Sequence, residues 1–333
     1  MVTLAVAGGT GGVGKTIVET LVRNSQHQII VLTRSVSHHG NLSDGLTVDL
    51  SHRFIQEPRS DHALDRTRQV QVDYDDIPSL VQVLQQHAIH TIISAIGIFD
   101  DATSRSQLNL IQAAEKSSVT KRFVPSEFSF IQTKDLLHVD PSIRHWLDAV
   151  ELLQRSHLQY TRVIPGFFMD YWGMPVVRTN LTPCTFGINI QHCQAAIPGD
   201  GNDVICMTYT YDMAAFLVRL LDVEDWPEFS IIVGDEVTYN QLLAMAEEIR
   251  GQKFQVTYDS KESIKEGRVT IPPMPEGHPY SSEDLQEMTA LVSRLTIAGA
   301  FKLPAENRLN DRFPDIQPVK MKQFLQDAWK DYK

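Results

Sequence analysis

The sequence predicts an α/β protein: a doubly wound parallel sheet of the Rossmann type over residues 1–165, then a second, smaller mixed α/β domain over residues 166–333. Three observations support this prediction. Short apolar runs alternate with helix-period segments through the first half. A glycine-rich loop joins the first apolar run to the first helical segment. After Ile164, prolines and glycines become frequent and irregular runs separate the helices. Some segments of this second half are expected to return to the main sheet.

The elements of the first half follow from the apolar pattern. Each strand is a short apolar run, and each helix repeats apolar residues three and four positions apart. The predicted strands are residues 2–7, 28–33, 70–73, 91–96, 122–125 and 160–164. The predicted helices carry their apolar faces at residues 17–22, 80–84, 108–114 and 143–153. Pro78 and Pro141 stand in the first turns of two of these helices, where proline is tolerated.

The second half contains fewer periodic segments. Helical faces are predicted at residues 213–221, 242–249, 285–295 and 324–329, with strands at 230–233 and 254–257. Between the second and third strands of the first half lies a polar stretch, residues 35–69, with four histidines. Its histidines, among them His38, His39 and His52, lack the spacing of metal ligands. We therefore predict a solvated insertion and no metal site.

Composition limits the classes of function. The chain has 333 residues, 42% of them hydrophobic, and a formal net charge of −11. This acidic balance argues against nucleic-acid binding, which requires a basic surface. No run of about 18 apolar residues is present, so no membrane span is expected. The three cysteines lack CxxC spacing and indicate reduced thiols. A cytoplasmic protein, monomer or homodimer, with a small-molecule substrate is the expectation.

The glycine loop that follows the first strand fits two templates. Gly9 and the run Gly14-Lys15-Thr16 satisfy the Walker A pattern of nucleoside triphosphatases, whereas Gly8, Gly11 and Gly14 satisfy the spacing of dinucleotide-binding loops. In both cases the backbone N–H groups at the start of the helix face phosphate, and glycine permits the close approach. A glycine turn without a ligand is the third possibility.

Neighbouring segments favour the dinucleotide. A triphosphatase needs an aspartate at the end of another strand for Mg²⁺, but the fourth strand ends in small residues, Ser94-Ala95-Ile96-Gly97. Small residues suit a dinucleotide that crosses the carboxyl ends of the strands. At the end of the second strand stands Arg34, where an NAD site usually has an acid. An arginine suits the 2′-phosphate of NADP(H).

The order of several motifs resembles the NmrA-like and isoflavone-reductase-like proteins, atypical members of the short-chain dehydrogenase superfamily, and looks closest to their fungal branch. The resemblance extends over essentially the whole chain. The segments that carry it are the glycine loop, Thr33-Arg34, Val72-Asp73-Tyr74, residues 123–128, Tyr160-Thr161, residues 166–171, residues 197–201, Asp212-Met213-Ala214 and Gly234-Asp235.

The resemblance implies an NADP(H)-binding Rossmann domain, a small substrate domain and an active cleft between them. Arg34 would hold the 2′-phosphate, and Ser126, in the segment Pro125-Ser126-Glu127-Phe128, would approach the nicotinamide end. Beside the adenosine and ribose would lie Ser94, Ala95 and Ile96. The pyrophosphate would be bound by Gly8, Thr10, Gly11, Gly12, Val13 and Gly14.

One departure from the family concerns the proton donor. Plant reductases of this family carry a catalytic lysine in the helix after residues 125–128, and alignment places that position near Trp146, where this chain has no lysine. The Tyr-x-x-x-Lys pair of other short-chain enzymes is also absent. Reduction of a carbonyl or imine needs a proton or positive charge at the heteroatom. The candidates are His145, Tyr171, Asp170 and Glu127, each of which also has a structural explanation.

Aromatic residues predict an apolar substrate pocket, although ordinary core packing explains any one of them equally well. The candidate pocket residues are Phe99, Phe128, Trp146, Phe167, Phe168 and Trp172.

Three hypotheses of function follow. The first is an NADPH-dependent reductase of a small aromatic or heterocyclic metabolite. The second is a redox-neutral cyclase or condensing enzyme with NADP bound, which the absent lysine motivates. The third is a regulatory protein that senses NADP(H) without turnover, as in the founding NmrA branch.

Overall fold

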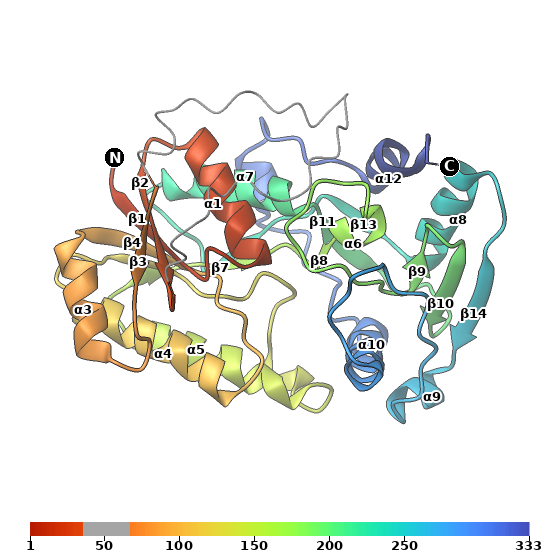
Figure 1. The fold of residues 1–333 in the computed structure, drawn as a ribbon, viewed down its shortest axis with the longest axis horizontal. Helices are drawn as coiled ribbons and strands as arrows, with labels where there is room; N and C mark the ends of the chain where they lie inside the picture. Colours follow the sequence, from red (N-terminus) through yellow and green to blue (C-terminus); the bar gives the residue numbers. More distant parts are fainter. Residues whose placement is uncertain (36–66, 333) are drawn as a thin grey trace. The chain divides into compact units, whose positions relative to one another are not determined.

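The computed structural model describes residues 1–35 and 67–332. The chain divides into two compact units (Figure 1). The first unit comprises Met1–Phe128, Ser142–Val163 and Ala214–Ser230, and the second comprises Ser129–Pro141, Ile164–Met213 and Ile231–Lys333. Each unit is therefore built from separate stretches of chain. Residues 36–66 of the predicted insertion, with His38, His39 and His52, lie outside the described residues.

The first unit contains a six-stranded sheet in the order β3-β2-β1-β4-β5-β6, with every neighbouring pair parallel. This confirms the predicted doubly wound parallel sheet. The order reverses between β1 and β4, and ligands of such sheets bind at this switch point, beyond the carboxyl ends of the strands. The bounds are β1 (Thr3–Ala7), β2 (Gln28–Thr33), β3 (Thr67–Gln71), β4 (Ile89–Ser94), β5 (Arg122–Val124) and β6 (Gln159–Tyr160).

Helices cover both faces of this sheet. Figure 1 shows α3 (Ile77–Gln86), α4 (Asp101–Lys116) and α5 (Arg144–Gln154) together on one side and α1 (Gly12–Asn24) on the other. Side chains alternate along each strand, so Ile30 and Leu32 of β2 pack in the core with α3, α4 and α5. Val31 faces the other way and lies near Val18 of α1. Both faces of the sheet are therefore buried, as its continuous apolar strands predict.

Two predicted strands are displaced in the structure. The third strand covers Thr67–Gln71 and not 70–73, because its register pairs Gln71 with Thr33 at the end of β2. The predicted sixth strand, 160–164, is divided. β6 ends at Tyr160, and β7 (Arg162–Ile164) pairs with β12 (Phe229–Ile231). The Arg162 N–H donates to the Glu228 carbonyl at 2.7 Å, which turns the chain away from the main sheet.

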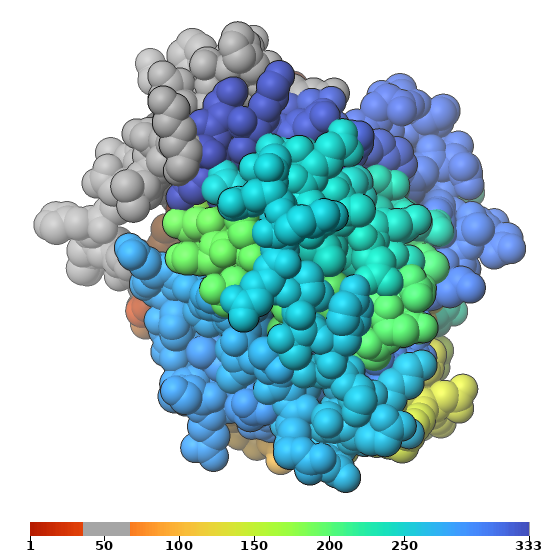
Figure 2. Space-filling view, turned by 90° about the vertical axis from the view of Figure 1, so that its right-hand side faces the viewer, coloured from red at the N-terminus to blue at the C-terminus, as the bar shows by residue number. Residues whose placement is uncertain are grey.

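The second unit contains two small mixed sheets, as predicted for this half. One has the order β13-β11-β8, from Asp235–Val237, Ile205–Thr208 and Phe167–Phe168. The other has the order β14-β10-β9, from Gln255–Asp259, Gln194–Pro198 and Ile188–Asn189. Most of these strands were not predicted, because runs of two to five residues among glycines and prolines carry little periodicity. Figure 2 looks onto this unit, with the teal and cyan segment around β14 in the middle of the view.

The remaining helices extend the predicted helical faces or are single turns. Their bounds are α6 (Asp170–Gly173), α7 (Thr210–Leu221), α8 (Tyr239–Arg250), α9 (Lys261–Lys265), α10 (Ser282–Ile297), α11 (Leu309–Arg312) and α12 (Met321–Trp329). Within the described part of the chain, no helix is long and apolar enough to cross a membrane. Among those same residues, no group of three or more His, Cys, Asp or Glu side chains is arranged to hold a metal ion.

Candidate functional site

The glycine loop links the end of β1 to α1 at the switch point of the sheet. Gly8 has a φ of +74°, and a Cβ there would lie 2.5 Å from the Ala95 carbonyl oxygen. A Cβ on Gly14 would collide with the Gly8 carbonyl. Gly11 differs, because a Cβ there would meet only the Gly8 oxygen, at 3.5 Å. Gly8 and Gly14 are thus required by the protein's own backbone, whereas Gly11 borders open space.

The start of α1 is suited to an anion. The helix begins at Gly12 with Gly11 as its N-cap, so no side chain caps the first N–H groups, and the first turn contains no acidic residue. Uncapped N–H groups and the helix dipole favour a phosphate at this end. Thr10 and Gly11 are exposed, and Gly12 and Val13 are half-buried. The predicted pyrophosphate residues therefore adjoin one another at the end of β1 and the start of α1, and of the six only Gly14 is buried.

Arg34 follows β2 on the same edge of the sheet. The Gly8 N–H donates to the Leu32 carbonyl at 3.4 Å, which places the glycine loop beside the end of β2. The backbone around Arg34 is held on both sides: the Thr33 hydroxyl donates to the Ser35 carbonyl at 2.8 Å, and the Gln71 amide donates to the Arg34 carbonyl at 3.0 Å. The Arg34 side chain itself is exposed.

The end of β4 offers backbone and small side chains. Ala95 and Ile96 are half-exposed, whereas Ser94 is fully buried and its hydroxyl has no hydrogen-bond partner. Of the three residues predicted to lie beside the ribose, the structure therefore exposes Ala95 and Ile96 at the edge and encloses Ser94. No carboxylate stands at the end of β4, where a Walker-type site would need one for Mg²⁺.

Residues 125–128, after β5, are fastened to three neighbouring elements. The Ser126 hydroxyl donates to the Ile96 carbonyl at 2.8 Å, and its N–H donates to the Gln107 side chain of α4 at 2.8 Å. The indole N–H of Trp146, on α5, donates to the Ser126 carbonyl at 2.8 Å. The structure therefore joins Ile96, Ser126 and Trp146, which were predicted separately. It also adds Gln107, a buried side chain that sequence analysis missed.

Glu127 forms a buried, two-pronged ion pair with Arg162. The Arg162 Nε donates to Glu127 Oε2 at 2.6 Å and its Nη2 donates to Oε1 at 2.5 Å. Arg162 was not predicted as a site residue. The available signal was an arginine inside the apolar run 160–164, because a buried charge needs a partner.

His145 is the buried candidate on α5. Its side chain is 7% exposed, and Nε2 lies 3.7 Å from a carboxylate oxygen of Asp101, at the start of α4. The Arg144 Nη2 donates to the same carboxylate oxygen at 2.5 Å. The structure thus gives His145 a nearby carboxylate.

Asp170 and Tyr171 belong to the second unit. Asp170 is fully buried and accepts three hydrogen bonds: from the Thr210 hydroxyl at 2.6 Å, the Thr179 hydroxyl at 2.7 Å and the Thr210 N–H, at the start of α7, at 3.0 Å. Burial raises the pKa of Asp170 to about 6, although these hydrogen bonds act against the rise. Burial also raises the pKa of Tyr171, which keeps its phenol neutral.

The predicted pocket aromatics divide between the two units. In the second unit Phe167 and Trp172 are buried, with ring centroids 5.2 Å apart, and Phe168 is buried as well. In the first unit Phe128 is buried and Trp146 is half-buried. Phe99 is 86% exposed, and its ring lies against Gly97. The Phe167 ring also packs against Tyr171, Phe186 and Phe301, and the Trp172 ring packs against Tyr239.

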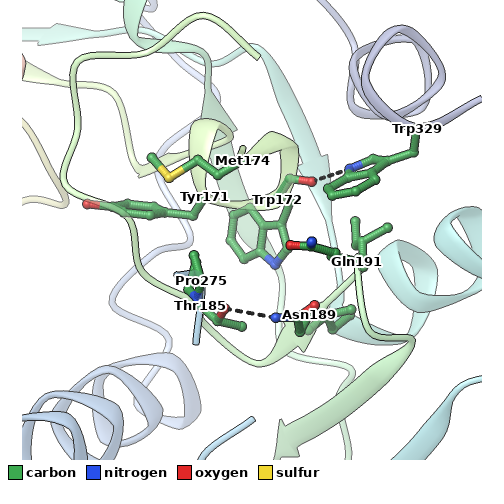
Figure 3. A pocket seen from close by; sticks show the side chains of 10 residues that line it. Tyr171, Trp172, Met174, Thr185, Asn189, Gln191, Pro275 and Trp329 are labelled. Carbon is green, nitrogen blue, oxygen red and sulfur yellow. Dashed lines mark hydrogen bonds between the residues drawn. The ribbon is translucent and has the colours of Figure 1, made fainter. Parts of the chain in front are cut away.

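The second unit also encloses a small cavity of about 10 Å³, with room for about one water molecule (Figure 3). Its wall includes Tyr171 and Trp172, and Trp329 donates from its indole to the Trp172 carbonyl at 2.7 Å. Thr185 and Asn189 line the cavity, with the Asn189 amide 3.4 Å from the Thr185 hydroxyl. The cavity is too small for a metabolite.

Comparison with known proteins identifies relatives along the whole chain. The model of the NmrA-like family matches residues 2–300. The protein named Oxidoreductase swnN of Metarhizium robertsii is 29% identical over 361 residues, covering 99% of this chain and 98% of that protein. Oxidoreductase BOA1 of Botryotinia fuckeliana is 34% identical over 263 residues, covering 79% and 81%.

Solved structures share the fold. A structure described as AtPrR2 with NADP+ and (+)pinoresinol has a TM-score of 0.69 and 19% identity and covers 98% of each chain. A ternary complex of leucoanthocyanidin reductase from Vitis vinifera has a TM-score of 0.68 and 15% identity and covers 97% of this chain and 98% of that one. With the family match over residues 2–300, these likenesses support a single assignment: the chain belongs to the NmrA-like family.

Proposed function

We propose that this protein is an NADPH-dependent reductase of a small aromatic or heterocyclic metabolite. One observation carries the proposal: two anion-binding features lie on the same edge of the sheet. The N-terminus of α1 has no side-chain cap and Gly11 in front of it borders open space, and Arg34 is exposed. Two of its relatives are named oxidoreductases, which supports the class of reaction. The NADP+ in the AtPrR2 complex supports the choice of cofactor.

The residues on this edge fit the cofactor, and each has a distinct role. The N–H groups that start α1 would bind the pyrophosphate, and the Arg34 guanidinium would pair with the 2′-phosphate in a charge-assisted contact. The half-exposed Ala95 and Ile96 would border the ribose. NADPH, when bound, supplies the hydride. The protein's own residues bind it, orient it and exclude water.

The substrate class rests on aromatic side chains and on relatives. Solved neighbours are described with (+)pinoresinol and as a leucoanthocyanidin reductase. In this chain the exposed Phe99 and half-buried Trp146 offer apolar surface in the first unit. We propose that they contact an aromatic or heterocyclic substrate.

For the proton we propose His145. Among the four candidates, Glu127 and Asp170 are engaged in several buried hydrogen bonds, and the raised pKa of Tyr171 makes its phenol a weak acid. His145 has the Asp101 carboxylate at 3.7 Å. Replacing His145 by Gln keeps its approximate size but removes the proposed proton donor, and should lower the rate by about 10²–10⁴-fold. His157→Gln, an exposed histidine that also pairs with a carboxylate, is the matched control. A full-rate His145→Gln protein would exclude His145 as the donor.

Transfer of label tests the reductase. A panel of aromatic and heterocyclic carbonyl and imine compounds is incubated with stereospecifically deuterated NADPH. One face of the cofactor should deliver deuterium to the product, with NADP+ formed in equal amount. Product formed without NADPH oxidation would contradict the reductase and favour the cyclase. Tight NADPH binding with no turnover of any compound would favour the sensing protein.

A further inference from the structure

The first unit contains a buried ion pair, Glu127 with Arg162, to which the proposed function assigns no role. The two side chains are 1% and 5% exposed, and both donor–acceptor contacts of the pair are short. The Arg162 guanidinium also stacks over the Phe229 ring, 4.6 Å from its centroid. A pair this deeply buried is stable only with near-ideal geometry, so it constrains the backbone on both sides.

On one side the pair holds residues 125–128. Glu127 lies next to Ser126, whose hydroxyl and N–H bond to Ile96 and Gln107 and whose carbonyl accepts from Trp146. With Arg162, the segment is anchored at four points: the end of β4, α4, α5 and β7. It follows β5, which neighbours β4 in the sheet, so it continues the edge that holds the glycine loop.

On the other side the pair lies where the chain leaves the first unit. The three stretches of the first unit end at Phe128, Val163 and Ser230. The residue just before each of these ends belongs to this cluster: Glu127, Arg162 and Phe229, respectively. A hydrogen bond of 2.7 Å between the hydroxyls of Thr161 and Ser230 joins two of the same stretches. The ion pair joins two of these stretches, and the stacking of Arg162 over Phe229 joins the third.

We propose that Glu127 and Arg162 are a positioning pair, which keeps residues 125–128 in the geometry that the reactive end of the cofactor requires. Glu127 in this pair does not donate a proton. Its carboxylate remains bound to the guanidinium throughout the reaction, and its contribution is orientation. This inference rests on the proposed NADPH-dependent reduction and names residues that support the site without touching substrate.

The test compares variants of the pair by three measurements on the full chain. The variants are Glu127→Gln, Arg162→Met and the double Glu127→Leu/Arg162→Met. The double variant replaces the pair by apolar side chains of similar size, and we expect it to retain the fold. The measurements are turnover with its pH profile, binding of NADPH and of 2′,5′-ADP, and hydrogen exchange of the peptide that contains residues 125–128. Glu151→Gln, which breaks the exposed pair with Arg155 on α5, is the control.

A positioning pair predicts one pattern. Each variant should lose about 10²-fold in kcat, because small misplacements of a reacting group have effects of that size. The losses should not add in the double variant. The pH profile should keep its shape, and exchange at residues 125–128 should rise. Binding of 2′,5′-ADP should be nearly unchanged, because that fragment would contact the glycine loop, Arg34, Ala95 and Ile96 but not residues 125–128.

Other results would overturn the inference. Loss of one limb of the pH profile in Glu127→Gln, with Arg162→Met near full activity, would make Glu127 the acid. Full activity of the double variant, or loss of 2′,5′-ADP binding in all three variants, would show that the pair supports the fold and does not position residues 125–128 for the reaction. A native protein that binds neither NADPH nor 2′,5′-ADP would instead overturn the proposed function, and this inference with it.

Discussion

At the scale of single residues, Arg34 is the side chain on which the choice of cofactor depends. Its backbone is held by Thr33 and Gln71 while its guanidinium is exposed. Arg34→Ala should weaken NADPH binding by about 10–10²-fold, since hydrogen bonds to charged groups contribute about 1.5–3 kcal/mol, and should leave NADH binding unchanged. Calorimetric titration with both cofactors measures this. Arg68→Ala, on the neighbouring β3, is the control: it removes one positive charge but no residue of the proposed cofactor site. Equal affinity of the native protein for NADPH and NADH would contradict the assignment.

Asp170 makes a second prediction at this scale, concerning pH. Its pKa is raised to about 6 in the folded protein, above the value of about 3.9 for an unfolded chain. The folded state therefore holds the proton more tightly. The resulting stability, on the order of 3 kcal/mol, is fully present below pH ~4 and is lost as the pH rises through ~6. In urea unfolding across this range, Asp170→Asn should remove that decline, whereas Asp148→Asn, at an exposed carboxyl, should retain it. An unchanged pH slope in Asp170→Asn would contradict the prediction.

At the scale of elements, the glycines of the turn between β1 and α1 have two different roles: some are needed for folding and one is needed for binding. Gly11 has a φ of −84° and faces open space, so Gly11→Val should fold with nearly native thermal stability. Its side chain would stand where the pyrophosphate approaches, so NADPH binding should be lost. Gly14→Ala should instead lower the melting temperature, because its Cβ collides with the Gly8 carbonyl. Native NADPH affinity in Gly11→Val would show that the ligand does not use this loop.

At the scale of the whole molecule, the first unit depends on a distant stretch of chain, residues 214–230. That stretch supplies two carbonyls and the Trp226 ring to Arg122 of β5, and the Glu228 carbonyl to β7. A fragment ending at residue 165 lacks all of these partners. It should unfold without a cooperative transition and be digested faster than the full chain. A fragment 1–165 as stable as the full protein would instead support residue 165 as a sufficient domain boundary.

Much of the first unit was predictable because its signals are local. Apolar runs and helical faces identified the strands and helices, and the parallel sheet follows from their alternation. A phosphate-binding loop was predicted from the spacing of Gly8, Gly11 and Gly14. NADP(H) as the cofactor was predicted from the position of Arg34 at the end of a strand. The displaced strand at 67–71 shows the limit of this reasoning, since an edge strand takes its register from its neighbour.

By itself, the sequence determined where the strands and helices of the first unit lie along the chain, the glycine loop and the position of Arg34. Neighbouring residues and a period of two or 3.6 encode these features. Only the tertiary structure decided that Arg162 pairs with Glu127, that Asp170 is enclosed by Thr179 and Thr210, and that residues 214–230 complete the first unit. Each of these joins residues far apart in the chain or sets their burial. The free energy of burying a charge depends on partners that no local pattern specifies.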